Sequence, residues 1–351
     1  MLTQSSIAHY LLSLGIVKPR AVVDDEFSVL DASRRNAVFI AAARTGPAYV
    51  VKQARAQTAG TLQREATMLR ALAVKPELHG IVPEVLHEDR ERACLVLRSP
   101  PDAADWTQHQ AIRRFPRSSA HALGQALASL HELPADGIDD LPAGPDRLWG
   151  LTLPEPPHEL LLDLSAAALD LLRRLQDQEL LCARLRELRG ATSSDAIVHG
   201  DLRWDNCMVV AAPGARRRTR VLLVDWELSG RGPAGFDIGT ALAEYVSAWV
   251  GSIPMPDPRD PSQFVDHARY PVASMRPAIG ALWTAYRSAR ARPPALAQVV
   301  ELAAVRLLQA ALERARHSDE LSAHAVVLAQ VAAHLLSAPE GTALALLGLH
   351  E

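Results

Sequence analysis

Three oxygen-bearing side chains adjoin short apolar runs and have the chemistry to share a cation. Asn206 precedes the apolar run 207–210, Asp201 lies shortly before it, and Asp225 follows the run 220–224. If the two runs pair as a hairpin, all three side chains meet at one end of it. Magnesium prefers oxygen ligands and usually keeps waters and substrate phosphates as further ligands. The pattern indicates that one carboxylate and the amide oxygen bind a cation. The other carboxylate is then free to accept a proton.

The elements that must position these residues divide the chain into two parts. The first hundred residues favour strands, at 27–30, 37–43, 48–53, 83–86 and 93–97, around one helix at 61–73. The later part favours helices, at 120–133, 160–189, 233–249, 277–291 and 295–336, with strands only at 196–198, 207–210 and 220–224.

A proline-containing segment, 98–102, separates the two parts, because adjacent prolines fix the backbone and remove hydrogen-bond donors. We therefore expect an α+β fold of two lobes. Residues 1–98 would form a small lobe with an antiparallel sheet and one helix, and residues 99–351 a larger, mainly helical lobe.

Composition excludes several classes of function. The 351 residues carry a formal net charge of −3, so the overall charge does not indicate binding to nucleic acid or to anionic lipid. No uninterrupted apolar run reaches the length of a membrane span, and the N-terminus predicts an amphipathic helix rather than a signal peptide. Three widely separated cysteines predict neither a disulfide framework nor a zinc site. We expect a cytoplasmic protein.

The run Val-His-Gly-Asp-Leu-Arg-Trp-Asp-Asn, residues 198–206, resembles the catalytic loop of aminoglycoside phosphotransferases and the related protein-kinase-like enzymes. Asp225 fits the family's aspartate after the following strand, and Gly235-Phe236-Asp237 supplies its later G-x-D. In the first lobe, Lys52 resembles the lysine of the third strand and Glu65 its partner on the next helix. The resemblance covers residues 20–250 and implies an ATP- and magnesium-dependent kinase with a bilobal fold.

The resemblance also implies a role for each matching residue. Asp201 would accept the proton of the acceptor hydroxyl or orient it, and Asn206 and Asp225 would hold magnesium. Lys52 would bind the α- and β-phosphates of ATP, with Glu65 fixing its position.

Two further features concern the phosphates. Arg203 lies where kinases often keep a lysine near the γ-phosphate, although a surface ion pair is an equal alternative. The first hairpin loop, 32–36, contains no glycine, whereas a glycine-rich loop would let backbone amides approach the phosphates closely. The side chains of Ser33, Arg34 and Asn36 are the candidates to replace those amides; the alternative is that the phosphates are held less tightly.

The acceptor is less defined. The sequence of the catalytic loop, together with Val-Asp-Trp-Glu at 224–227, resembles the corresponding motifs of the phosphotransferase-like proteins of class V lanthipeptide pathways. That resemblance implies a kinase for Ser or Thr of a precursor peptide, working with a lyase partner. The apolar tail 343–349 would then dock a partner or pack on its own core. Two alternatives stay open: a kinase for a small hydroxyl compound such as an antibiotic, sugar or amino alcohol, and an inactive pseudokinase that only binds.

Overall fold

The computed structural model describes residues 1–24, 26–33, 36–55, 58–100, 103–113, 115–134, 148–162, 164–211, 219–255 and 265–350. Residues 212–218, which join the predicted strands 207–210 and 220–224, lie outside the described residues. The same holds for Arg34 and Arg35 of the glycine-free loop and for the acidic, proline-containing residues 256–260.

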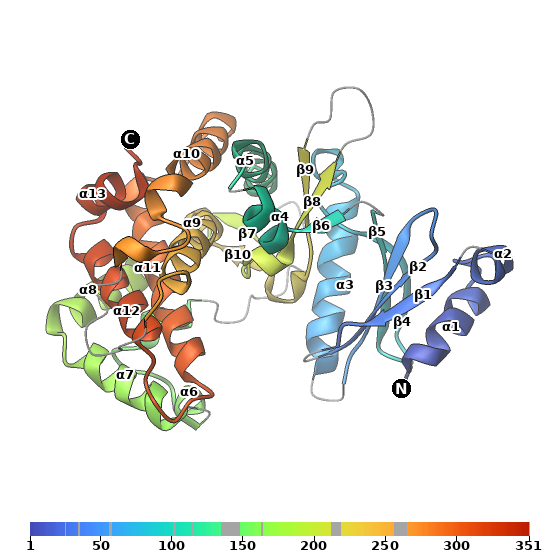
Figure 1. The fold of residues 1–351 in the computed structure, drawn as a ribbon, viewed down its shortest axis with the longest axis horizontal. Coiled ribbons are helices and arrows are strands. Elements are labelled where there is room, and N and C mark those ends of the chain that lie inside the picture. Colours follow the sequence, from blue (N-terminus) through green and yellow to red (C-terminus); the bar gives the residue numbers. More distant parts are fainter. Residues whose placement is uncertain are drawn as a thin grey trace.

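The N-terminal part of the chain is built on a five-stranded antiparallel sheet with the order β1-β2-β3-β5-β4 (Figure 1). The strands are β1 (Ser28–Asp31), β2 (Ala37–Ala42), β3 (Ala48–Gln53), β4 (Glu84–Asp89) and β5 (Cys94–Ser99). The helix α3 (Ala59–Ala73) covers one face, and α1 (Ile7–Ser13), followed by the short α2 (Pro19–Val23), covers the other. The predicted strands and helix of this part are confirmed.

The alternation of side chains along a strand explains how one sheet serves two helices. On β5, Leu95 packs in the same core as the α3 residues, whereas its neighbour Val96 packs with those of α1. On β3, Val51 belongs to the α1 side. The next residue, Lys52, therefore faces α3.

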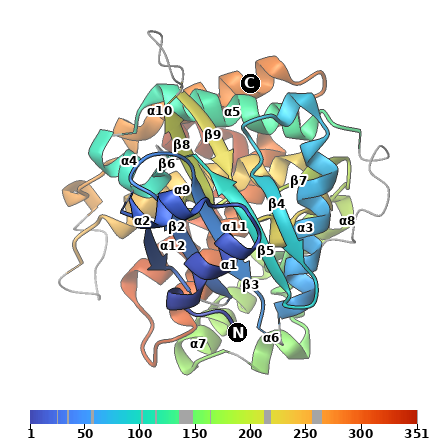
Figure 2. The same cartoon turned by 90° about the vertical axis from the view of Figure 1, so that its right-hand side faces the viewer.

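Most of the remaining chain is helical, as the sequence predicts, and the α+β expectation is confirmed. The helices are α4 (Trp106–Arg113), α5 (Arg117–His131), α6 (His158–Leu162), α7 (Ala166–Gln176), α8 (Glu179–Ala191), α9 (Ala234–Gly251), α10 (Val272–Ala289), α11 (Leu296–Ala315), α12 (Ala323–Ser337) and α13 (Pro339–Thr342). Figure 2 looks along the long axis, with the N-terminal sheet in front of these helices.

Two helices predicted as continuous are interrupted. Residues 160–189 form α6, α7 and α8, and residues 295–336 form α11 and α12. Serine side chains begin new helices inside both ranges. Ser165 accepts a hydrogen bond from the Ala168 amide at 3.2 Å, and Ser322 accepts one from the Ala325 amide at 3.3 Å. Such N-caps satisfy amides that the first helical turn leaves free, and apolar periodicity does not reveal them.

Two small sheets lie between the main sheet and the helices. The predicted hairpin is confirmed as β8 (Cys207–Ala211) and β9 (Thr219–Leu223), in which Cys207 pairs with Leu223. Two strands are not predicted from the sequence: β6 (Ala103–Asp105), which pairs with β8, and β10 (Gly230–Gly232), which pairs with β7 (Ala196–Val198). Both missed strands are three residues long, too short to show an alternating pattern.

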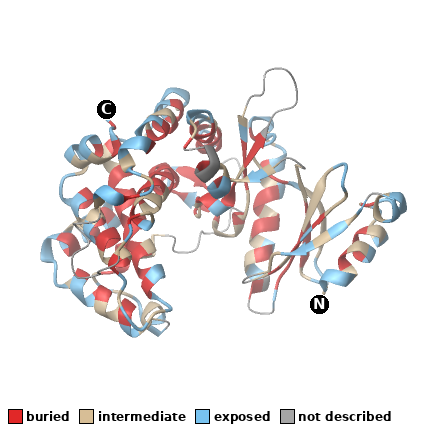
Figure 3. Ribbon diagram, viewed as in Figure 1, coloured by how far each residue is buried: buried red, intermediate tan, exposed pale blue. Residues whose placement is uncertain are grey.

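The centre of the helical part is α9, which is buried along most of its length (Figure 3). The apolar tail packs on the molecule's own core, since Ala343, Leu347 and Leu349 are all buried there. Arg276 of α10 donates hydrogen bonds to the carbonyl oxygens of Leu346, at 3.2 Å, and of Ala345. Among the described residues, no helix combines the length and apolarity that crossing a bilayer requires.

Candidate active site

A buried lysine joins the two parts of the molecule. Lys52 Nζ lies 2.7 and 3.0 Å from the two carboxylate oxygens of Glu65, and 2.7 Å from Asp225 Oδ1. The side chains of Lys52 and Glu65 are 9% and 2% exposed, whereas that of Asp225 is 36% exposed. The Lys52 ammonium group therefore binds the buried carboxylate of Glu65 on α3 and the partly exposed carboxylate of Asp225, which follows β9.

The backbone around Asp225 turns sharply to present its side chain. Its φ of 68° lies in the left-handed region, which aspartate tolerates better than most residues. Just before it, the Val224 amide donates to the Asn206 carbonyl oxygen at 2.9 Å, extending the β8–β9 hairpin by one pair. Asn206 and Asp225 thus lie at the same end of the hairpin, as the sequence analysis expects.

Asp201 and Asn206 are joined directly. The Asn206 Nδ2 group donates at 2.9 Å both to the Asp201 carbonyl oxygen and to Asp201 Oδ2. The amide nitrogen of Asn206 is thereby turned toward Asp201, and its oxygen toward the other side. This arrangement fixes the Asp201 carboxylate by its own neighbour five residues along the loop.

His199 braces the loop from inside. Its Nε2 group lies 3.0 Å from the Val224 carbonyl oxygen, which can only accept, so Nε2 carries a hydrogen. Its Nδ1 then accepts the Asp201 amide at 3.3 Å. The imidazole is fully buried and packs against Trp226 with 4.7 Å between ring centroids. His199 thus links the residue before Asp225 to the backbone of Asp201.

Asp237 of α9 anchors the same loop by its backbone. Its Oδ2 accepts the His199 amide at 2.7 Å, and its Oδ1 accepts the Gly200 amide at 2.9 Å. His131 Nε2 lies 3.1 Å from the same Oδ2. Burial raises the pKa of the Asp237 carboxyl, but the hydrogen bond and charge of His131 outweigh it, and the pKa lies below its ordinary value.

The two acidic residues of the site have opposite pKa shifts. Burial alone would raise the pKa of Asp225, but the charge and hydrogen bond of Lys52 lower it overall. Burial raises the pKa of Asp201, and the positive charges of Arg203 and Arg306 oppose that rise only in part. Asp225 is therefore held as a carboxylate, whereas Asp201 is the more basic group, as suits a proton acceptor.

Arg203 forms ion pairs with two acidic residues of the same loop. Its guanidinium lies 3.1 Å from Asp205 Oδ2 and 3.7 Å from Asp201 Oδ1. Burial would lower its pKa, but the charges of Asp201, Asp205, Glu313 and Glu244 raise it. Two carboxylates therefore lie close to this arginine, and two more act on it electrostatically.

Two of those carboxylates, Glu244 and Glu313, are not predicted as site residues from the sequence. Glu244, on α9, accepts the Trp204 amide at 3.0 Å, and burial raises its pKa. Glu313 forms a two-bond pair, at 3.1 and 3.0 Å, with the buried Arg306 of α11. Charged residues within long helices resemble a solvated face in the sequence. Only the packing of α9 and α11 brings them near the catalytic loop.

Ser33 and Asn36, the candidates to replace a glycine-rich loop, lie in the connection between β1 and β2. Ser33 Oγ accepts the Val38 amide at 3.1 Å, within the hairpin. Asn36 Oδ1 accepts the Thr58 hydroxyl at 2.5 Å, at the N-terminus of α3. Ser33 is thereby tied to β2, and Asn36 to the start of α3.

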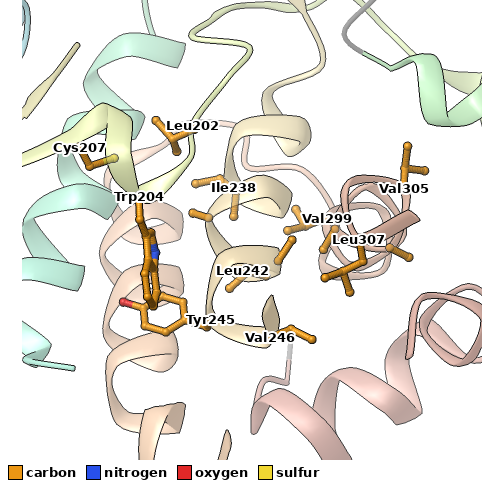
Figure 4. Packing of buried hydrophobic residues seen from close by; sticks show 14 of the residues in the cluster. Leu202, Trp204, Cys207, Ile238, Leu242, Tyr245, Val246, Val299, Val305 and Leu307 are labelled. Carbon is orange, nitrogen blue, oxygen red and sulfur yellow. The ribbon is translucent and has the colours of Figure 1, made fainter. Parts of the chain in front are cut away.

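The large aromatic residues beside the loop serve packing. Trp204 is 7% exposed and meets Tyr245 of α9 edge to face, with 5.1 Å between ring centroids. Figure 4 shows Leu202 and Trp204 beside Ile238, Leu242 and Tyr245 of α9. Trp226 is fully buried, and its indole NH donates to the Leu223 carbonyl oxygen at 2.8 Å. These contacts seat the catalytic loop on the core.

The phosphotransferase enzyme family matches residues 26–269 of this chain. The chain belongs to this family, and it is a phosphotransferase that uses an alcohol group as acceptor. The match spans the main sheet, the Lys52–Glu65 pair, the catalytic loop and α9.

A solved structure shares the fold, and a second is similar to the chain over most of its length. A choline/ethanolamine kinase family protein from Mesorhizobium loti is 20% identical, with a TM-score of 0.58 and 96% of each chain covered. A choline kinase from Streptococcus pneumoniae is 16% identical, with a TM-score of 0.45, 94% of this chain covered and 99% of the other. No curated protein matched the chain.

Proposed function

We propose that the protein is an ATP- and magnesium-dependent phosphotransferase that moves the γ-phosphate to a hydroxyl group. The observation that carries this proposal is the buried ion pair of Lys52 with Glu65, extended to Asp225. Burying a lysine between two carboxylates has a large desolvation cost, so its placement here suggests a function beyond stability. A lysine at the end of the hairpin that carries Asn206 and Asp225 suits phosphate binding, with ATP taking over part of its interaction with Asp225.

The donor set fits magnesium. Asp225 is kept ionised by Lys52, and the Asn206 oxygen is turned away from Asp201, so a carboxylate and an amide oxygen lie at the same hairpin end. These are hard oxygen donors of the kind that magnesium accepts together with phosphate oxygens and water. Bound there, magnesium would neutralise charge on the phosphates of ATP.

Asp201 would act on the acceptor. The acceptor oxygen attacks the γ-phosphorus of ATP, the bond from that phosphorus to the β–γ bridging oxygen breaks, and ADP leaves. The hydroxyl proton passes to Asp201, whose pKa is raised by burial. His199, Asn206 and Asp237 hold this residue in place, which matters because phosphoryl transfer depends mainly on positioning and charge neutralisation.

Three further residues complete the proposed nucleotide site. Arg203 would stabilise charge on the transferred group, since its guanidinium lies 3.7 Å from Asp201. Ser33 and Asn36 would contact the phosphates from the connection between β1 and β2. The proposed lobes remain residues 1–98 and 99–351, and the proposed location is the cytoplasm.

The charges that act on Arg203, two residues after Asp201, favour an acceptor with a positive group. Asp201, Asp205, Glu244 and Glu313 supply four carboxylates, against the guanidinium groups of Arg203 and Arg306. The cluster therefore carries two more negative than positive charges when all are ionised. An amino alcohol or amino sugar, offering a hydroxyl and an ammonium group, would match it.

The competing acceptor is Ser or Thr of a precursor peptide, with a lyase as partner. It rests on the resemblance of residues 198–206 and 224–227 to the class V lanthipeptide proteins. The same ATP and magnesium chemistry would serve it, so only the acceptor distinguishes the two.

Mass spectrometry tests both acceptors together. The protein is incubated with ATP, magnesium and either a panel of amino alcohols and amino sugars or a candidate precursor peptide. We expect one phosphate to be gained by a small acceptor, and Asp201→Asn to reduce turnover roughly 1000-fold, within the range for a lost general base. Phosphate on the peptide alone would replace the small acceptor by the peptide. No transfer to any acceptor, with ATP still bound by calorimetry, would make the protein a binding module.

A further inference from the structure

A buried hydrogen-bond chain leaves the catalytic loop and ends on a helix far along the sequence. It runs from the amides of His199 and Gly200 to Asp237 of α9, then to His131 at the end of α5. From His131 Nδ1 it continues to the hydroxyl of Tyr286 on α10, at 2.9 Å. We propose that Tyr286 is a positioning residue of the phosphotransferase, acting on Asp201 through His131 and Asp237. This inference rests on the proposed function.

Because the groups that form this series of hydrogen bonds are buried, losing any one of the bonds leaves a polar atom without a partner. Asp237 and Tyr286 are 0% exposed and His131 is 2% exposed, so water does not replace a lost partner easily. Asp237 accepts three hydrogen bonds, two of them from the amides immediately before Asp201. Any rotation of its carboxylate would therefore shift the backbone that carries Asp201.

The orientation of Asp237 depends on His131, and the orientation of His131 depends on Tyr286. Because the pKa of Asp237 is lowered, its carboxylate accepts, and His131 Nε2 must carry a hydrogen. The other nitrogen, Nδ1, then needs a partner of its own. A hydroxyl can donate to it or accept from it, so Tyr286 satisfies the imidazole in either protonation state. Phenylalanine at position 286 would leave Nδ1 buried without this partner.

The packing of α5 against α10 shows that this contact is held firmly. Gly124 lets the two helices approach, since a Cβ atom there would overlap the Leu282 carbonyl oxygen and lie 3.0 Å from the Tyr286 nitrogen. One turn beyond Tyr286, the Arg290 guanidinium donates to the His131 carbonyl oxygen. The ring of Tyr286 meets that of His131 edge to face, with 5.6 Å between centroids. Helix α10 therefore fixes both the backbone and the side chain of His131.

The test is Tyr286→Phe, which removes only the hydroxyl. We expect kcat to fall roughly 10-fold, less than the about 100-fold that a 1 Å misplacement can cause, while KM for ATP stays near the wild-type value. Hydrogen exchange, read by mass spectrometry, should show the amides of His199 and Gly200 exchanging roughly fivefold faster. A residue with a purely structural role would lower thermal stability without changing either readout.

Tyr10→Phe is the matched control. Tyr10 is also buried, at 6% exposure, and its hydroxyl donates to Asp89 Oδ2 at 3.3 Å, on the α1 face of the N-terminal sheet. The same chemical change there should leave kcat and the exchange of residues 199–200 unchanged. Wild-type kcat in Tyr286→Phe, or unchanged exchange at those two amides, would overturn the proposal.

The proposal stays testable if Tyr286→Phe does not fold and if the wild-type protein shows no phosphotransfer. If Tyr286→Phe does not fold, His131→Gln and His131→Ala replace it, because glutamine can still donate toward Asp237 and alanine cannot. The proposal then expects clearly higher kcat for glutamine, and equal values would refute it. If the wild-type protein transfers phosphate to no acceptor, the proposed function fails, but hydrogen exchange at residues 199–200 still decides the positioning role.

Discussion

Replacing Lys52 by methionine tests the buried ion pairs most directly. Methionine keeps most of the apolar stem and removes the charge, leaving Glu65, 2% exposed, without its cation. Losing one partner of a buried pair costs about 3–5 kcal/mol of unfolding free energy. Because the Asp225 side chain is 36% exposed, water screens that half of the interaction. We therefore expect a loss of about 3 kcal/mol at pH 7, the low end of that range.

The loss should depend on pH in a defined direction. The pKa of Lys52 is raised because its two carboxylates outweigh burial, so its contribution is complete below the unfolded value of 10.5 and is lost as pH rises through the raised pKa. The pKa of Asp225 is lowered, so its contribution is present above 3.8 and is lost as pH falls through the lowered pKa. The difference between wild type and Lys52→Met should be full near neutral pH and smaller below pH 3.8.

Urea unfolding followed by circular dichroism measures this difference at pH 7 and at pH 3, and thermal unfolding should show a Tm lowered by roughly 6 °C at pH 7. Lys18→Ala is the control, since Lys18 is exposed and precedes the short α2. We expect that control to unfold like the wild type. An equal unfolding free energy for Lys52→Met and wild type at pH 7 would refute the reasoning, as would a difference that grows on acidification.

Three more predictions follow from the geometry. The acid limb of kcat/KM should have its midpoint above 3.8, because burial raises the pKa of Asp201 and the base must be ionised; a limb at or below 3.8 would exclude this role. Asp225→Asn should weaken ATP binding in titration calorimetry with magnesium present, and equal affinity would exclude Asp225 as a ligand. Gly124→Ala should lower the unfolding free energy by about 1–3 kcal/mol in urea, because its Cβ would overlap the Leu282 carbonyl oxygen. Gly280→Ala, with open space around it, should not destabilise, and equal effects would contradict the packing.

Much of the candidate site could be predicted from the sequence because it depends on local patterns. The strand carrying Lys52, the helix carrying Glu65 and the hairpin flanked by Asn206 and Asp225 all lie where apolar periodicity predicts them. The residues whose positions depend on helix packing could not be predicted so well. Glu244 lies within a buried helix, and no periodicity distinguishes it from an ordinary polar position.

The sequence by itself determined the class of this protein, because the order of the lysine strand, the His-Gly-Asp loop and the Asp225 strand is a local property of the chain. The tertiary structure alone decided how that loop is supported and which charges surround it. Tyr286 reaches His131 across 155 residues, and Arg184 of α8 pairs with Glu301 of α11 across 117 residues. Such pairs depend on how helices pack, and packing is set by the shapes of whole helix faces, which a linear pattern does not encode.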